Sequence, residues 1–115
     1  MPYQPVVDSD IAFFKTIIGP DQVLVDAESR QRYGRDETEN LVFPPEVVLK
    51  PSTTEEISAI MKHCNQRCIP VTPRGAGTGL SGGALPHLGG VSLSMERLNR
   101  ILQIDERNLQ VTVEP

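Results

Sequence analysis

The sequence is poor in aromatic side chains: it has no tryptophan, and phenylalanine and tyrosine together supply 4% of its 115 residues. It also lacks an uninterrupted apolar run of the about 18 residues that a membrane-spanning helix needs, so we expect no transmembrane segment. Hydrophobic residues make up 38% and charged residues 23%, a composition that excludes disordered and collagen-like chains. A chain of this length can form one domain with its own core.

Basic residues are outnumbered by acidic ones. The 11 lysines and arginines stand against 15 aspartates and glutamates, which gives a net charge of −4. Binding to a polyanion needs an excess of positive charge, so we expect no nucleic acid partner. The first basic residue is Lys15 and the first arginine is Arg30, a pattern without a secretory or transit leader. The sequence therefore predicts a cytoplasmic protein.

Cysteine is scarce as well, and Cys64 and Cys68 cannot form a disulfide framework. On one helix their β-carbons would lie about 5 to 6 Å apart, too far for a bridge, so we expect reduced thiols. His63 would add a third candidate zinc ligand. A structural zinc site needs four ligands, and His63 points about 100° away from Cys64 around a helix. We therefore expect these side chains to serve in packing.

Residues 1–45 predict an N-terminal helical segment. Apolar side chains recur at helical spacing from Ile11 to Ile18, after the acidic start at Asp8–Asp10. Residues 23–25 have the character of a short strand, and Asp26 is placed to cap a second short helix. The acidic run 36–39 is expected to be solvated surface.

Residues 46–74 predict a strand, a helix and a second strand. The apolar run 47–49 is suited to a buried strand. Ser52 and Thr53 each precede a glutamate by three positions, which is the pattern of a capping box at a helix start. An extended run at 70–73 then completes a compact βαβ unit. One face of the helix is expected to meet the core through Ile57, Ile60, Met61 and Cys64.

Three more strands are predicted in the last part of the chain, at 91–95, 100–104 and 109–114, and the last two should pair as a hairpin. Apolar and polar residues alternate through the final strand, which predicts one buried face. A half-buried strand at a chain end leaves an open edge, so we expect a domain truncated at its C-terminus. Such a fragment is also expected to self-associate. The predicted fold class is α+β.

A glycine-rich stretch is the most unusual feature, because seven of the nine glycines lie in residues 73–90, PRGAGTGLSGGALPHLGG. Glycine accepts positive φ angles and lets a ligand approach the main chain, so successive N–H groups can turn inward and bind an anion. No aspartate or glutamate occurs from 75 to 95 to repel a phosphate. The lone His87 in this stretch is expected to be solvated rather than part of a site.

Two phosphate-binding motifs fit this stretch poorly. A P-loop needs a lysine after its second glycine, and the chain has none beyond Lys62. Gly77, Gly79 and Gly82 match the G-x-G-x-x-G spacing of a dinucleotide fingerprint. That motif requires a helix to start within it, which the following glycines and Pro86 forbid. An extended loop that binds phosphate through its backbone alone is the remaining interpretation.

The stretch from Val71 to Pro115, with GGVSLSMERLNRILQID and VTVEP after the glycines, resembles the FAD-binding domain of FAD-linked oxidases. It is most similar to the branch that contains glycolate oxidase and D-lactate dehydrogenase. The resemblance implies a PCMH-type FAD-binding fold, of which residues 46–115 would be the first part. It also implies a flavin-dependent oxidoreductase that acts on a small 2-hydroxy acid, of which this fragment alone would be inactive. Association with other oxidase subunits is the expected alternative to self-association.

The resemblance further implies a site. The loop would hold the FAD diphosphate, without a covalent bond, because Thr78 stands where relatives with covalently attached flavin have a histidine. No catalytic residue and no metal ligand is assigned. The alternative is a non-catalytic module that binds a phosphorylated ligand in a glycine nest. The expected cofactor-binding residues are Arg74, Gly75, Ala76, Gly77, Thr78, Gly79, Ser81 and Gly82.

Overall fold

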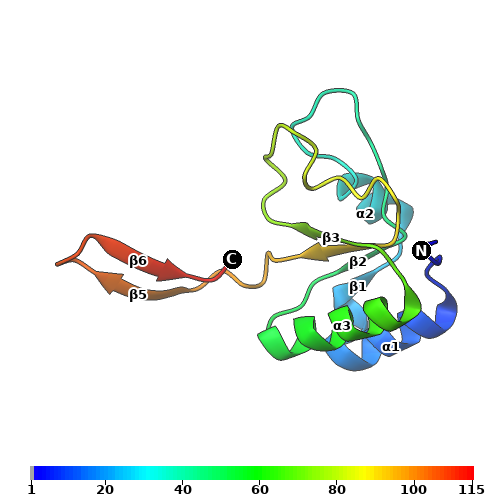
Figure 1. Cartoon of the computed structure of the whole chain (residues 1–115), viewed down its shortest axis with the longest axis horizontal. Coiled ribbons are helices and arrows are strands. Elements are labelled where there is room, and N and C mark those ends of the chain that lie inside the picture. Colours follow the sequence, from blue (N-terminus) through cyan, green and yellow to red (C-terminus); the bar gives the residue numbers. More distant parts are fainter. Residues whose placement is uncertain (1) are drawn as a thin grey trace.

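The computed structural model describes residues 2–115 as a body of helices packed on a mixed sheet, from which a hairpin projects (Figure 1). The predicted α+β class is confirmed. No helix within the described residues is long and apolar enough to cross a membrane. The elements are α1 (Asp8–Ile18), η1 (Pro20–Gln22), β1 (Val23–Leu24), α2 (Ala27–Arg32), β2 (Val47–Leu49), α3 (Thr54–Arg67), β3 (Val71–Arg74), β4 (Val91–Ser94), β5 (Ile101–Asp105) and β6 (Gln110–Val113).

The main sheet has the strand order β1-β2-β4-β3. Strands β2 and β3 are parallel and are connected through α3 as predicted, but β4 lies between them and pairs in parallel with both, so the two strands of the βαβ unit are not neighbours. All four residues of β4 are buried, so this strand takes a central position. Strand β3 contains Pro73, which has no N–H for a second ladder and therefore suits an edge.

Helix α3 begins where the capping pattern predicts. The Thr53 hydroxyl accepts a hydrogen bond from the Glu56 N–H at 3.1 Å, and the Glu56 carboxylate accepts one from the Ser52 N–H at 3.1 Å. Ile60 and Cys64 are buried as expected, but Met61 is 43% exposed. Met61 lies about 100° around the helix from Ile60, outside the narrow stripe that meets the core.

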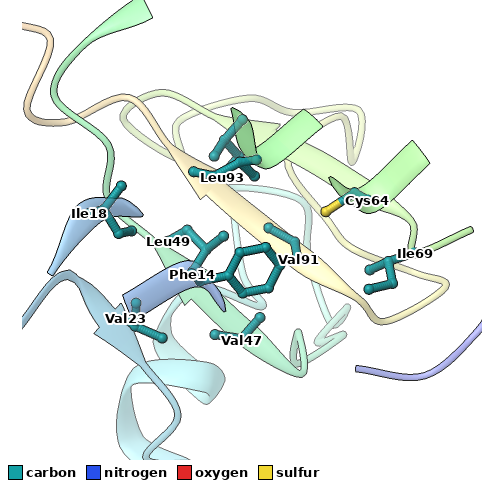
Figure 2. Close-up of a cluster of buried hydrophobic side chains, with 10 residues drawn as sticks. Phe14, Ile18, Val23, Val47, Leu49, Cys64, Ile69, Val91 and Leu93 are labelled. Carbon is teal, nitrogen blue, oxygen red and sulfur yellow. The ribbon is translucent and has the colours of Figure 1, made fainter. Parts of the chain in front are cut away.

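The hydrophobic core lies between the main sheet and helices α1 and α3 (Figure 1). Phe14 of α1 is fully buried and lies among strand side chains such as Leu49 and Val91 (Figure 2). Residues on both sides of position 45 contribute to this core, since α1 and β1 pack with β2, α3 and β4. The buried set is Phe14, Ile18, Val23, Val47, Leu49, Ile60, Cys64, Ile69, Val91 and Leu93.

Strands β5 and β6 form the predicted antiparallel hairpin, which extends away from the body (Figure 1). The expectation of one buried face in the last strand is wrong for the described residues. Leu109 is 92% exposed, and Val111 and Val113 are more than half exposed. Two strands cannot cover their own faces, and every residue of β6 is exposed.

A buried carboxylate joins α1 to α3. Asp10 is 1% exposed, and its carboxylate accepts hydrogen bonds from Arg67 Nε at 3.0 Å and from the Val7 N–H at 2.9 Å, and lies 2.7 Å from His63 Nε2. The His63 ring stacks on Phe13 with centroids 4.2 Å apart. Burial raises the pKa of Asp10, but the bonds from Arg67, Val7 and His63 outweigh it and lower the pKa from 3.8 to about 2.

This lowered pKa makes the fold sensitive to acid. A carboxyl whose pKa is lower in the folded state stabilises the fold above its unfolded pKa and loses that contribution as the pH falls. We expect Asp10→Asn to reduce the free energy of unfolding at pH 7 by about 2 kcal/mol. The difference from the wild type should shrink as the pH falls from about 4 to about 2, as measured by urea unfolding.

Asp8→Asn is the matched control for this prediction, because Asp8 is exposed on the same helical turn and makes none of these bonds. This variant should leave the free energy of unfolding at neutral pH nearly unchanged. If Asp10→Asn lowered the free energy of unfolding by the same amount at every pH, the stabilisation could not come from the ionised Asp10 carboxylate.

Candidate functional site

The glycine-rich stretch forms an extended loop between β3 and β4, without helix or strand from 75 to 90. Gly77 and Gly82 have φ angles of 73° and 79°, a region that residues with side chains rarely adopt. Among the described residues, no backbone N–H from 75 to 82 donates a hydrogen bond. A run of free amide donors on an exposed loop is the arrangement that binds an anion.

The loop leaves the sheet at the carboxyl end of β3, beside the carboxyl end of β4. The two ends are joined by a hydrogen bond from the Met95 N–H to the Arg74 carbonyl oxygen at 2.9 Å. Ligands of open parallel sheets commonly bind at this edge. A hollow of about 180 Å³ lies there, lined by Arg32, Tyr33, Arg74, Gly75, Ala76, Ser94 and Glu96. A second hollow of about 400 Å³ borders Gly75 and Ala76 and extends to the base of the hairpin.

The Arg74 side chain lies between the glycine loop at Gly77 and the segment that contains Tyr33 and Arg35. Its guanidinium donates to the Arg35 carbonyl oxygen at 2.6 Å and to the Tyr33 carbonyl oxygen at 3.4 Å, and lies 5.3 Å from the centre of the Tyr33 ring. A Cβ atom added at Gly77 would lie 2.2 Å from the guanidinium. The positive φ favours glycine at position 77, and a larger side chain there would also have to displace the end of the Arg74 side chain.

Tyr33 and Glu96 form a polar network at the floor of the smaller hollow. The Tyr33 hydroxyl donates to the Glu96 carboxylate, which also accepts from the Ser94 hydroxyl at 3.0 Å and lies 3.4 Å from the Lys50 ammonium group. Burial and the neighbouring Glu96 raise the pKa of Tyr33. Burial also raises the pKa of Glu96, but the bonds from Tyr33 and Ser94 and the charge of Lys50 lower it overall.

The sequence did not single out this network. Its one local signal is the pair of polar residues Ser94 and Glu96 at the end of a strand that is otherwise buried. Tyr33 lies in a different part of the chain, and only the fold brings it to Glu96.

Two carboxylates from other parts of the chain lie beside the glycine-rich stretch, which itself contains no acidic residue. The Glu46 carboxylate accepts a hydrogen bond from the Gly90 N–H at 3.2 Å. One carboxylate oxygen of Asp36 is buried, and a Cβ added at Gly79 would lie 3.9 Å from it. The expectation that the acidic run 36–39 is solvated surface is therefore wrong for Asp36, because the Glu37 N–H donates to the Gly79 carbonyl oxygen and holds this segment against the loop.

The residues proposed from the sequence form one continuous segment: Arg74 is the last residue of β3, and the others lie on the loop up to Gly82. The side chains of Thr78 and Ser81 are exposed and make no hydrogen bond among the described residues. His87 is exposed as well. The loop and the segment 33–38 run side by side at the top of the body in Figure 1.

Comparison with known proteins places this geometry in a family. The sequence pattern of the FAD binding domain matches residues 45–115. The chain is 41% identical over 115 residues to a D-lactate dehydrogenase of Anaerostipes hadrus, an alignment that covers 97% of this chain and 24% of that protein. It is 39% identical over 99 residues to the glycolate oxidase subunit GlcD of Bacillus subtilis, with 86% of this chain and 21% of that protein covered.

A solved structure of p-cresol methylhydroxylase has the same fold over 92% of this chain and 22% of its own, with a TM-score of 0.75 and 26% sequence identity. The chain thus spans about a quarter or less of the length of these relatives. The resemblance to the glycolate oxidase and D-lactate dehydrogenase branch is confirmed by the two sequence relatives. Since the matched pattern covers more than half of the residues and includes the whole glycine loop, the chain belongs to the FAD binding domain family.

Proposed function

We propose that the loop from Arg74 to Gly82 binds the diphosphate group of FAD. The observation that carries this proposal is the run of free backbone N–H groups from 75 to 82, held open by two glycines with positive φ. The residues that would hold the cofactor are Arg74, Gly75, Ala76, Gly77, Thr78, Gly79, Ser81 and Gly82. With Thr78 at the position of the covalent histidine in some relatives, the cofactor would be bound without a covalent bond.

The donors are numerous enough to hold a charged group. A hydrogen bond to a charged partner contributes about 1.5 to 3 kcal/mol, so several that converge on one diphosphate can dominate its affinity. Arg74 adds positive charge at the entrance, since it makes no ion pair within 4.0 Å among residues 2–115. Its guanidinium donates to two backbone carbonyl oxygens, which are neutral, and no carboxylate of the described residues contacts it directly. Its positive charge therefore remains available to an anionic ligand.

The proposed role of the whole protein is oxidation of a small 2-hydroxy acid, as the names of the D-lactate dehydrogenase and glycolate oxidase relatives suggest. FAD would supply the acceptor for the hydride removed from the substrate. In this chain we assign binding residues only and no catalytic base. Residues 46–115 would be the first part of the FAD-binding domain and residues 1–45 its N-terminal segment, and a cytoplasmic location stays a prediction from the sequence.

The first test is direct. The protein as encoded by its gene, purified gently and supplied with FAD, should show visible flavin absorbance after gel filtration. Anaerobic addition of D-lactate or glycolate should then bleach that absorbance, because the reduced flavin absorbs less. A protein that binds phosphate but stays free of flavin would favour the alternative of a non-catalytic phosphate-binding module.

A second test concerns Gly77. We expect Gly77→Val in the same protein to lower FAD occupancy at least tenfold, because a branched side chain disfavours positive φ and would collide with Arg74. The flavin-to-protein absorbance ratio measures the effect, and circular dichroism checks the fold. Gly83→Val is the control, since no atom lies within 4 Å of a Cβ added at Gly83 and its φ is not positive. Equal occupancy in the two folded variants would contradict the proposed loop contact.

The hairpin supports a separate proposal, self-association of the 115-residue chain. Ile104 and Val111 lie opposite each other and are 63% and 56% exposed. The chain should sediment as larger species at higher concentration, and the double variant Ile104→Glu, Val111→Lys should reduce this while an opposite-charge pair keeps the strands paired. Met61→Lys on α3 is the control. A monomer at every concentration would refute the proposal.

A further inference from the structure

The segment 33–38 holds the glycine loop from one side, and the proposed function gives it no role. The Glu37 N–H donates to the Gly79 carbonyl oxygen at 3.0 Å, and the Arg74 guanidinium donates to the Arg35 carbonyl oxygen. These bonds connect the segment both to the middle of the loop and to its first residue. The backbone of the loop is therefore fixed by contacts that lie outside the loop itself.

Asp36 shapes the turn that makes this contact possible. One oxygen of its carboxylate, Oδ1, accepts a hydrogen bond from the Thr38 N–H at 2.8 Å, two residues ahead. A carboxylate bonded in this way closes a local turn in the backbone. The turn satisfies the Thr38 N–H and leaves the N–H of the intervening Glu37 directed outward, where it reaches Gly79.

The anchored carbonyl also sets the direction of a donor. In a planar trans peptide unit the C=O and the following N–H point to opposite sides. Because the Gly79 carbonyl oxygen is bound toward Glu37, the N–H of Leu80 points away from the segment 33–38. The same bond therefore restrains the middle of the run of free amides from 75 to 82.

The charge of Asp36 would by itself oppose an anionic ligand. The Thr38 side chain and N–H, the charge of Arg74 and the backbone N–H of Ala84 lower the pKa of Asp36, so the group is ionised at neutral pH. Its second oxygen, Oδ2, is buried without a hydrogen bond of ordinary geometry among the described residues. A buried, ionised oxygen without a well-formed hydrogen bond destabilises a fold, and next to a phosphate-binding loop its charge also repels an anionic ligand. An aspartate at position 36 is therefore unfavourable both for the stability of the fold and for the binding of an anion. The turn nevertheless requires a side chain that accepts the hydrogen bond from the Thr38 N–H.

We propose that Asp36 is a positioning residue for the glycine loop: its turn presents the Glu37 N–H to Gly79 and so orders the amides that bind the FAD diphosphate. This inference rests on the proposed function of the loop. It identifies a residue about forty positions away in the sequence as a determinant of cofactor affinity. It also states which property of that residue matters, namely hydrogen-bond acceptance and not negative charge.

The test compares Asp36→Ala with Asp36→Asn in the protein as encoded by its gene. Asparagine keeps the acceptor for the Thr38 N–H and removes the charge, whereas alanine removes both. We expect Asp36→Ala to weaken FAD binding about tenfold, as followed by quenching of flavin fluorescence, and Asp36→Asn to stay within about threefold of the wild type. Glu39→Ala is the control, because it removes a neighbouring exposed charge that makes no hydrogen bond to any of residues 2–115.

Three results would overturn the inference. Tighter binding in both Asp36 variants would mean that charge repulsion dominates, and equal weakening in both would mean that the charge itself is required. Unchanged affinity in Asp36→Ala would mean that the turn does not order the loop.

A measurement without FAD separates this inference from the proposed function. Amide hydrogen exchange at Glu37 should accelerate in Asp36→Ala and not in Asp36→Asn, while amides in β4 keep their protection and report an intact fold. Slow exchange at Glu37 in Asp36→Ala would refute the positioning role whether or not the protein binds flavin. Absence of FAD binding by the wild type, with accelerated exchange in the variant, would refute the proposed function alone.

Discussion

The parallel pairing of β3 with β4 is the constraint on which the rest of the structure depends. Parallel neighbours have their carboxyl ends at the same edge, so the chain must travel the length of the sheet between Arg74 and Val91 before it can enter β4. Most parallel connections use a helix for this return. Here the connection is a loop rich in glycine, and its backbone donors therefore stay unpaired and exposed at the edge where ligands of such sheets bind.

The loop is ordered by neighbours more than by its own sequence. Arg74 lies beneath Gly77, and Glu37 binds Gly79. The carboxylates of Asp36 and Glu46 also lie beside the glycine-rich stretch, so it does not form a uniformly positive cavity that would attract a phosphate at long range. The proposed binding of a diphosphate would then depend on short, directed hydrogen bonds, which act only when the ligand is in place.

Much of the fold follows from local patterns in the sequence. Caps, apolar periodicity and turn residues predicted both long helices and the hairpin, because each depends on contacts within a few residues. The insertion of β4 between β2 and β3 and the exposure of the final strand depend on which distant elements cover which face, and no local pattern reports that. The same limit applies to the site: the glycines are visible in the sequence, whereas the approach of Asp36 and the link between Tyr33 and Glu96 exist only once the chain has folded.

The proline in β3 has a consequence for how this sheet can meet other chains. Its missing N–H interrupts the row of donors along the outer side of an edge strand, so a foreign strand cannot form a continuous ladder there. Sheet extension is thereby discouraged on the side from which the glycine loop emerges. The strand that leads into the glycine loop is therefore protected from β-strand addition along its outer side.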